Sequence, residues 1–267
     1  MVRRRINNFN LRQIADSGQC FRMVMLDDAH ARLVAFGRAL DITDNVDGPL
    51  DFSCTEEEYE SVWSGYFDLD EDYAGFISSI DPEDGFLTRA AEHGSGIRIL
   101  RQEPFETLIS FIISQRKNIP AIQSSVEKLC RTCGEKIGDE IYAFPKPSDI
   151  ARLSSAELEG CSLGYRAPYV REAARRVSSG EISLEALMDL SDDKLFDELM
   201  SFYGVGRKIA NCVMLFAYHR IGAFPVDVWI QRIEDEYYGG RFPVKKYQGF
   251  AGVMQQYMFF YGRKTGV

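Results

Sequence analysis

Hydrophobic and polar positions alternate in the first part of the chain. The apolar positions of this series are Phe21, Met23, Met25, Leu33, Ala35, Leu40 and Ile42. A period of two is the pattern of a strand with one buried face, and Asp27-Asp28 between two such runs is a turn signal. We therefore expect an antiparallel sheet between Phe9 and about Ser53.

The pattern changes to helical spacing near residue 54. Thr55 followed by Glu58 is a capping box, which predicts a helix through Tyr66. The segment from Phe105 to Ser114 is apolar nearly all round, so this helix should lie at the centre of a core. Further helices are predicted over 119–133, 147–153, 155–160, 167–178, 183–189, 191–202 and 247–261.

Two glycines one residue apart, Gly204 and Gly206, separate a helix-periodic run over 195–202 from another over 209–217. This arrangement predicts a helix, a hairpin and a second helix. Glycines at a hairpin allow positive φ and bring backbone N–H groups close to an anion, and the next helix directs its positive dipole end the same way. A nucleic-acid phosphate suits such a site, although an ordinary glycine-rich turn has the same pattern.

Lys208 and Asp227 are the candidate catalytic residues. Lys208 falls in the first turn of the second helix, where the helix dipole and partial burial disfavour its protonated form, and a neutral lysine amine is a nucleophile. Asp227 follows Pro225-Val226 and precedes an amphipathic run, so it is a predicted N-cap that can return to face the amine. Taken singly, a lysine such as Lys208 is more often a solvated surface residue, and an aspartate such as Asp227 is most often only an N-cap.

A net charge of −9 is unusual for a protein that binds nucleic acid, but the acid is unevenly distributed. Residues 1–95 hold 8 Lys+Arg against 19 Asp+Glu, and residues 96–267 hold 23 against 21. The acidic stretch from Asp41 to Glu92 is expected to be a solvated face. A protein that binds no nucleic acid can have the same charge balance.

The expected fold class is α+β, with an N-terminal antiparallel α/β domain over 1–95 and a helical part over 96–267.

Composition is that of a globular protein, with 45% hydrophobic and 27% charged residues. No apolar run reaches the length of a membrane span, and the six cysteines show no secreted disulfide spacing. We expect a monomeric intracellular protein, in the cytoplasm or nucleoid if the source is prokaryotic, without membrane contact.

Two further segments combine aromatic and polar side chains. Tyr165 and Arg166 lie in a short turn, where an aromatic ring can wedge into a base stack and the arginine can contact an orphaned base. A surface tyrosine beside a solvated arginine is the alternative. Gln255, Met258 and Phe259 fall on one side of the last helix, where they bind a base or pack in the core.

These motifs resemble those of the helix-hairpin-helix DNA glycosylases, whose hairpin G-V-G-x-K and later V-D match Gly204 to Lys208 and Val226-Asp227. The 8-oxoguanine DNA glycosylase branch is similar at three more places, namely Ser17 to Arg22 (S-G-Q-x-F-R), Leu100 to Pro104 (L-R-Q-D-P) and Leu163 to Ala167 (L-G-Y-R-A). The resemblance covers nearly the whole chain. It implies a twisted antiparallel N-terminal sheet followed by a two-part helical glycosylase domain, with the hairpin over 200–208 and a final helix closing the cleft.

The resemblance also implies an activity and a set of roles. The protein would be a bifunctional glycosylase and abasic-site lyase that excises 8-oxoguanine from duplex DNA and cleaves the strand by β-elimination. Lys208 would form a Schiff base at C1′, supported by Asp227. The Gly18 carbonyl would accept the N7 hydrogen, Cys212 and Phe259 would sandwich the base, and Gln255 would meet its Watson–Crick edge.

The DNA contacts implied by the resemblance are made by Gly204, Gly206, Asn118, Tyr165 as the wedge and Arg166 as the reader of the estranged cytosine. No cofactor is required. The backbone carbonyls of Met200, Phe202 and Val205 match positions that often hold a monovalent cation such as Na⁺ or K⁺.

The chain departs from the family pattern around the opposite base. Arg116 and Lys117 stand before Asn118 where asparagines are usual, and Ala121 replaces a second cytosine-reading arginine. We expect flexible point charges there to relax opposite-base specificity. Trp229 replaces a histidine common two positions after the aspartate.

Two other functions fit parts of the sequence. Gly204 to Asn211 (GVGRKIAN) equally matches endonuclease III-like glycosylases for oxidised pyrimidines, but that branch carries four cysteines for an iron–sulfur cluster after the aspartate. No cysteine follows Cys212, so no cluster is expected. A non-catalytic helix-hairpin-helix DNA-binding module would need the hairpin but neither Lys208 nor Asp227.

Overall fold

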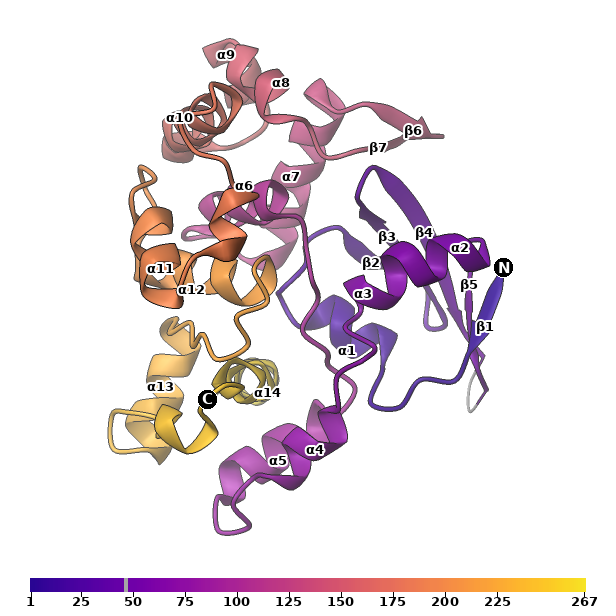
Figure 1. Ribbon diagram of the computed structural model, residues 1–267, viewed down its shortest axis with the longest axis vertical. Helices are drawn as coiled ribbons and strands as arrows, with labels where there is room; N and C mark the ends of the chain where they lie inside the picture. The colour runs from indigo at the N-terminus through magenta and orange to yellow at the C-terminus, as the bar shows by residue number, and fades with distance from the viewer. Residues whose placement is uncertain (46–47) are drawn as a thin grey trace.

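Five short antiparallel strands form the N-terminal sheet of the computed structural model, in the order β1-β5-β4-β3-β2 (Figure 1). They are β1 (Val2–Arg4), β2 (Met23–Met25), β3 (His30–Ala35), β4 (Arg38–Asp44) and β5 (Leu50–Phe52). The structure describes residues 1–45 and 48–267. Met23 pairs with Leu33, and Leu33 with Leu40, so these three apolar side chains share one fully buried face of the sheet. The predicted sheet is confirmed.

The start of the sheet was predicted wrongly, because helix α1 (Leu11–Asp16) occupies the segment after Phe9. Asn10 caps this helix by accepting a hydrogen bond from the Gln13 N–H at 2.9 Å. Leu11, Ile14 and Ala15 follow the i, i+3, i+4 spacing and face the core. Helical spacing over six residues is too short to stand out against the alternating pattern that follows it.

The capping box predicted at Thr55 and Glu58 is present and opens a continuous helical segment. This segment comprises α2 (Glu56–Glu58), a π-helical turn (Tyr59–Trp63) and α3 (Ser64–Tyr66). Its aromatic side chains pack on the sheet, and the Tyr59 ring contacts Phe52 edge to face at 5.2 Å. A first core therefore lies between the sheet and this segment.

Helices form most of the remaining chain, as predicted. They are α4 (Tyr73–Ser78), α5 (Gly85–His93), α6 (Pro104–Ser114), α7 (Ile119–Cys133), α8 (Pro147–Arg152), α9 (Ser155–Gly160), α10 (Ala167–Ser178), α11 (Asp192–Met200), α12 (Arg207–Phe216), α13 (Val228–Tyr237) and α14 (Ala251–Thr265), with 3₁₀ turns at Gly164–Arg166, Ala186–Asp189 and Val244–Tyr247. No helix in the described part of the chain is long and apolar enough to cross a membrane.

Three details of the helical part differ from the prediction. The segment over 183–189, predicted as a helix, forms only a 3₁₀ turn at Ala186–Asp189. A small hairpin of β6 (Lys136–Gly138) and β7 (Ile141–Tyr142) follows α7. The last helix was predicted over 247–261 but begins at Ala251, because a 3₁₀ turn ends at Tyr247 and Gly249 takes a positive φ of 93°. Glycine accommodates that conformation, which interrupts the apolar run.

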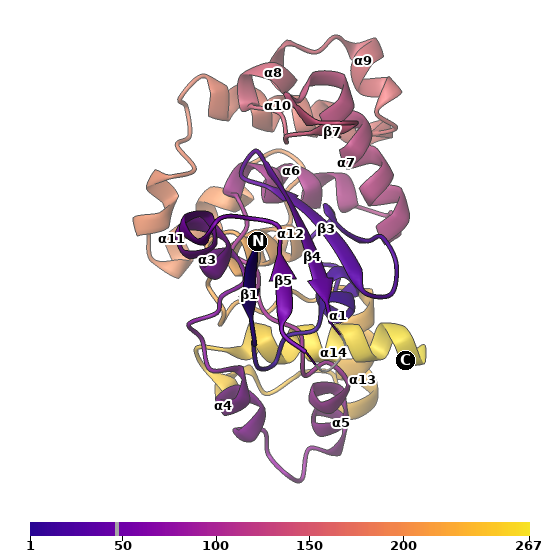
Figure 2. The same cartoon turned by 90° about the vertical axis from the view of Figure 1, so that its right-hand side faces the viewer.

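The helices gather in two groups with α6 and α12 between them (Figures 1 and 2). Helices α7 to α10 lie at one end, and α4, α5, α13 and α14 at the other. Helix α14 packs against both α5 and α13, so α4 and α5 contribute to the same hydrophobic cluster as the C-terminal helices. The domain boundary at residue 95 stays a prediction.

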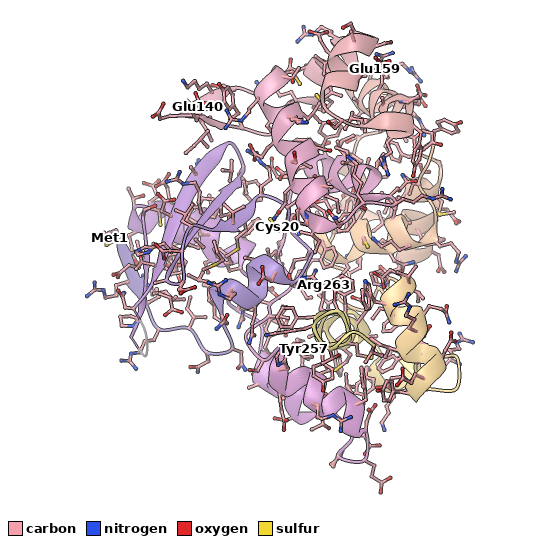
Figure 3. The ribbon with its side chains drawn as sticks, turned by 180° about the vertical axis from the view of Figure 1, so that it is seen from behind. Met1, Cys20, Glu140, Glu159, Tyr257 and Arg263 are labelled. Atoms are coloured by element: carbon pink, nitrogen blue, oxygen red, sulfur yellow. The ribbon has the colours of Figure 1, made fainter. Side chains whose placement is uncertain are left out.

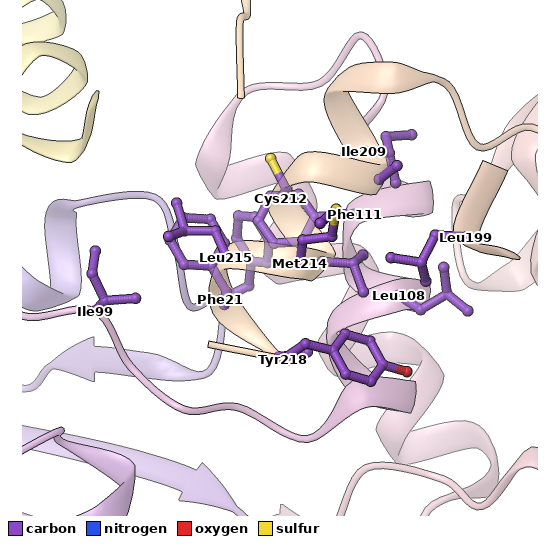
Figure 4. Packing of buried hydrophobic residues seen from close by; sticks show 14 of the residues in the cluster. Phe21, Ile99, Leu108, Phe111, Leu199, Ile209, Cys212, Met214, Leu215 and Tyr218 are labelled. Atoms are coloured by element: carbon purple, nitrogen blue, oxygen red, sulfur yellow. The ribbon is translucent and has the colours of Figure 1, made fainter. Parts of the chain in front are cut away.

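The central helix α6 fixes the position of α12. Leu108 and Phe111 are buried against Ile209, Cys212 and other apolar residues of α12 (Figure 4). Burial of one such side chain contributes roughly 1.5–3 kcal/mol. The rigid contact between these two helices therefore sets where the start of α12 points.

Candidate active site and DNA interface

Lys208 lies in the first turn of α12, as predicted, and its side chain is half-buried. Its Nζ atom lies 5.0 Å from the centroid of the Phe111 ring, whose face attracts a cation. The apolar packing of α6 and α12 thus places the amine at the floor of a cleft, away from the solvated surface where most lysines lie.

Asp227 is the N-cap of α13, which confirms the prediction. Its Oδ1 atom accepts hydrogen bonds from the N–H groups of Trp229 at 3.0 Å and Ile230 at 2.9 Å. Among the described residues, no hydrogen bond involves its Oδ2 atom. One oxygen therefore holds the helix, and the other is available for chemistry in the cavity that Asp227 lines with Lys208.

A cleft of about 1090 Å³ leads to the candidate base pocket. A smaller cavity of about 40 Å³ adjoins it, and both are lined by Gly18, Lys208, Asp227 and Phe259. Cys212 and Gln255 complete the small cavity. All six predicted catalytic and base-binding residues thus meet at one place. The small cavity has room for little more than a water molecule, so entry of a purine requires a side chain to move.

Gly18 is required by both conformation and space. Its φ is +77°, and a Cβ atom there would lie 3.0 Å from the Phe259 ring and 3.2 Å from the Ile119 side chain. Glycine reaches this backbone conformation without strain. The backbone of Gly18 therefore borders the pocket with no side chain in the way, as the sequence predicted.

Gln255 and Cys212 are buried polar and polarisable groups in the pocket wall. Gln255 is 3% exposed, and its Oε1 atom accepts a hydrogen bond from Gln256 at 3.0 Å. Burial raises the pKa of the Cys212 thiol, so the sulfur is neutral, as a packing surface for a base should be. Met258 is fully buried in the core and does not line the cavity.

The two hairpin glycines serve different purposes. Gly204 has a φ of +83°, and a Cβ atom there would lie 2.4 Å from the Tyr169 ring. Gly206, the N-cap of α12, has a φ of −102°, so the expectation of positive φ is wrong for it. A Cβ atom at Gly206 would meet nothing within 4 Å. Gly204 makes room for Tyr169, and Gly206 leaves the exposed backbone open to an approaching phosphate.

Tyrosine rings connect the hairpin to the predicted wedge. Tyr169 contacts Tyr203 on the hairpin edge to face at 4.7 Å and Tyr165 at 6.0 Å. Tyr165 is 49% exposed, as a ring that enters a base stack must be. The spacing between the hairpin and the wedge is therefore set by packed side chains.

Arg166 is placed differently from an exposed reader of a base. It is only 6% exposed, and its Nε atom donates to the Gln115 carbonyl at 2.7 Å while Nη1 donates to the Leu163 carbonyl at 3.1 Å. Its guanidinium carbon lies 4.3 Å from the Tyr165 ring centroid. Arg166 must exchange the Gln115 carbonyl for the estranged cytosine if it is to read that base.

Lys117 is partly buried and its amine is held by hydrogen bonds, which contradicts the expectation of a flexible charge. Its Nζ atom donates to the Ser162 carbonyl at 2.7 Å and to Ser125 Oγ at 2.5 Å. Lys128 donates to Ser162 Oγ at 2.8 Å. Burial lowers the pKa of Lys117, and the charges of Arg166 and Lys128 lower it further. These bonds, together with the bond from Arg166 to the Gln115 carbonyl, form a clamp that holds the loop over 115–118 and helix α7 to the wedge turn.

Arg116 and Asn118 are the exposed residues of the loop over 115–118. Arg116 has a φ of +52°, a region that asparagine tolerates better than arginine. Asn118 caps α7 by accepting a hydrogen bond from the Ala121 N–H at 2.9 Å. Arg116 and Asn118 both line the main cleft, so Arg116 is an exposed charge on the wall of that cleft.

Two further cleft residues received no role from the sequence. Trp229 lines the cleft beside Arg232, whose guanidinium carbon lies 5.2 Å from the Trp229 ring centroid. Arg263 of α14 lines it beside Phe259. A basic residue in the last turn of a helix is an ordinary favourable feature, so the sequence offered no signal for Arg263.

Comparisons with known proteins agree with this arrangement. The model of the 8-oxoguanine DNA glycosylase N-terminal domain matches residues 1–108, and that of the HhH-GPD superfamily of base excision DNA repair proteins matches residues 109–243. The Clostridium acetobutylicum 8-oxoguanine glycosylase/lyase, crystallised with dsDNA containing cytosine opposite to 8-oxoG, is 34% identical with a TM-score of 0.92. The likeness covers 98% of this chain and 94% of that one.

Curated relatives extend the comparison to other organisms. A probable N-glycosylase/DNA lyase of Methanothermobacter thermautotrophicus is 29% identical over 243 residues, which are 79% of this chain and 76% of the relative. The N-glycosylase/DNA lyase of Saccharomyces cerevisiae is 35% identical over 184 residues, 63% of this chain and 48% of the yeast protein. The chain belongs to the 8-oxoguanine DNA glycosylase family of the HhH-GPD superfamily.

Proposed function

We propose that this protein is a bifunctional DNA glycosylase and abasic-site lyase that excises 8-oxoguanine from duplex DNA. The observation that carries the proposal is the meeting of Lys208, Asp227, Gly18 and Phe259 around one cavity at the floor of a cleft. The names of two relatives, N-glycosylase/DNA lyase, state both the glycosylase and the lyase activity. Because the substrate is cellular DNA, we expect the protein to be located where that DNA is.

Extrusion of the damaged nucleotide is the first step. Unpairing and unstacking cost about a few kcal/mol, which phosphate contacts at the hairpin, the Tyr165 wedge and stacking on Phe259 offset. The small cavity is too narrow for a purine, so we expect Phe259 to move when the base enters. Cys212 then packs on the opposite face of the base.

Lys208 and Asp227 carry out the chemistry. The Lys208 amine attacks C1′, the C1′–N9 bond breaks, and its electron pair leaves with the base, which takes up a proton. The Asp227 carboxylate stabilises the positive charge that develops on the sugar. Ring opening gives an iminium between Lys208 and C1′, loss of a C2′ proton follows, and the 3′ phosphate leaves by β-elimination.

A monovalent cation at the hairpin is proposed on the carbonyl oxygens of Met200, Phe202 and Val205. The Phe202 carbonyl already accepts a hydrogen bond from the Val205 N–H at 3.0 Å, which fixes its direction. A carbonyl oxygen has a second lone pair for a cation. The cation would add positive charge beside the phosphate site and takes no part in the bond-breaking steps.

Borohydride trapping on a duplex that contains 8-oxoguanine tests the proposed function. A covalent protein–DNA adduct is expected, because reduction of the Lys208 iminium makes the bond permanent. A non-catalytic binding module would shift the duplex without forming an adduct. An endonuclease III-like enzyme would form the adduct on thymine glycol and not on 8-oxoguanine.

We expect this protein to discriminate less among the bases opposite the lesion than it would with a second cytosine-reading arginine. The Ala121 side chain offers no donor, Arg116 is exposed to solvent, and Lys117 donates its hydrogen bonds to Ser125 and Ser162. A missing bidentate contact removes about 1–3 kcal/mol of selectivity, or roughly 5- to 150-fold. Single-turnover excision with each of the four bases opposite 8-oxoguanine measures it, and a steep preference for cytosine over all three others contradicts the expectation. The Ala121→Arg variant should increase the preference for cytosine opposite the lesion.

Substitutions in the pocket should affect 8-oxoguanine selectively. Gly18→Ala places a methyl group 3.0 Å from Phe259 in a left-handed backbone conformation, so excision should fall steeply. Phe259→Ala should weaken lesion capture by about 1–3 kcal/mol, the value of one stacked base. Single-turnover rates on matched 8-oxoguanine and thymine glycol duplexes measure both effects. Faster release of thymine glycol, unchanged in either variant, would favour the endonuclease III-like alternative.

A further inference from the structure

Arg263 is a charged side chain in the active-site cleft with no part in the proposed chemistry. It lies in the last turn of α14, one turn after Phe259, and its guanidinium carbon is 5.6 Å from the centroid of the Phe259 ring. Its Nη2 atom donates to the Asp16 carbonyl at 2.8 Å, two residues before Gly18. Figure 3 labels it where α14 approaches α1 and α13.

The other terminal nitrogen of Arg263 is an unsatisfied donor. Nη1 is buried and has no hydrogen-bond partner among residues 1–45 and 48–267. A buried guanidinium N–H left without an acceptor is costly, and native proteins rarely retain one without a reason. This nitrogen lies 3.5 Å from the position that a Cβ atom at Gly18 would occupy. The free donor therefore points to a ligand acceptor beside Gly18.

8-Oxoguanine differs from guanine at two adjacent atoms. N7 carries a hydrogen, and C8 carries a carbonyl oxygen, O8. The proposed function, on which this inference rests, assigns the N7 hydrogen to the Gly18 carbonyl and leaves O8 without a partner. Because O8 is bonded to the carbon next to N7, a group that reads it must lie within a few ångströms of Gly18.

We propose that Arg263 is a specificity-determining residue that donates a hydrogen bond from Nη1 to O8 of the extruded base. A guanidinium donor to a carbonyl is charge-assisted and stronger than a neutral pair. Guanine presents a C–H group at the same place, so its entry would leave Nη1 buried and without an acceptor. Contact with Phe259 brings Arg263 against the base at the moment when the stacking ring closes on it.

The test uses the Lys208→Gln background, in which binding is measured without turnover. Dissociation constants are determined for duplexes that contain 8-oxoguanine, guanine or a tetrahydrofuran abasic analogue opposite cytosine, with and without Arg263→Met. Methionine keeps the length of the side chain and its packing on Phe259. The ratio of guanine to 8-oxoguanine dissociation constants should fall by about 10- to 100-fold, and the affinity for the analogue should not change.

Two further variants separate this role from others. Lys264→Met removes a neighbouring exposed charge whose Nζ lies 6.0 Å from the Phe260 ring centroid, and it should leave the ratio unchanged. Arg263→Lys can still bond to the Asp16 carbonyl, but its single nitrogen cannot also occupy the position of Nη1, so it should lose discrimination as methionine does. Restoration of the ratio by lysine would overturn the proposal in favour of a role in holding the Asp16 carbonyl.

A parallel loss of affinity for all three duplexes would also overturn the proposal. It would indicate that Arg263 binds a phosphate. The steepness of the plot of log affinity against log salt concentration would then decrease by the amount that one phosphate contact contributes. An unchanged ratio in Arg263→Met overturns the proposal as well. Failure of the proposed function is recognised separately, because the unmodified enzyme would then neither excise 8-oxoguanine nor be trapped on it.

Discussion

The Lys208→Gln variant should bind lesion DNA but neither excise the base nor be trapped by borohydride. Glutamine keeps most of the side-chain length and its contact with Phe111 but has no nucleophilic amine. Loss of a nucleophile that forms a covalent intermediate lowers turnover by on the order of 10⁴-fold or more. Single-turnover excision, trapping and a binding isotherm on one 8-oxoguanine duplex measure all three properties.

Lys194→Gln is the matched control for the Lys208 prediction. Lys194 is exposed on α11, and its replacement removes the same charge without touching the cleft. It should excise and be trapped like the unmodified protein. If Lys208→Gln kept strand cleavage and trapping, another amine would be the nucleophile and the assignment would be wrong.

The Asp227→Asn variant should keep its fold and lose most of its turnover. Asparagine caps helices as well as aspartate does, so its side-chain oxygen can still accept from the Trp229 and Ile230 N–H groups. The carboxylate charge beside the sugar is lost, and removal of one preorganised electrostatic group costs about 10²–10³ in turnover. Single-turnover rates and the melting temperature, measured together, test both statements.

Asp227→Ala separates the two roles of the carboxylate. Loss of the cap should destabilise the protein by about 0.5–2 kcal/mol, whereas Asp227→Asn should leave the melting temperature nearly unchanged. If Asp227→Asn lost stability and activity to the same degree as Asp227→Ala, a catalytic role for the charge would be unsupported.

The sequence predicted the helices around the site well because their signals are local. The capping box at Thr55, the N-cap at Asp227 and the apolar run of α6 each lie within a few residues of the element they define. Helix α1 was missed for the same reason, since one turn and a half of helix leaves little periodicity. A local sequence signal is therefore easier to recognise for a long helix than for a short one.

Long-range contacts explain what the sequence could not predict about individual side chains. Nothing near Lys117 indicates that its amine reaches Ser162, 45 positions later, because that bond depends on how α7 packs beside the wedge turn. Arg166 likewise turns inward to a carbonyl 51 positions away. The need for glycine at Gly204 comes from the Tyr169 ring, which only the folded chain brings to it.

The clamp made by Lys117, Lys128 and Arg166 limits how this enzyme can change over evolution. It connects the loop that faces the opposite base to the turn that carries the Tyr165 wedge. A substitution that changes the loop to suit another opposite base also disturbs the wedge, and so changes the rate at which the damaged nucleotide is extruded. Opposite-base preference and extrusion rate should therefore change together during evolution. Substitutions that change the preference alone should be confined to positions outside the clamp, such as Arg116.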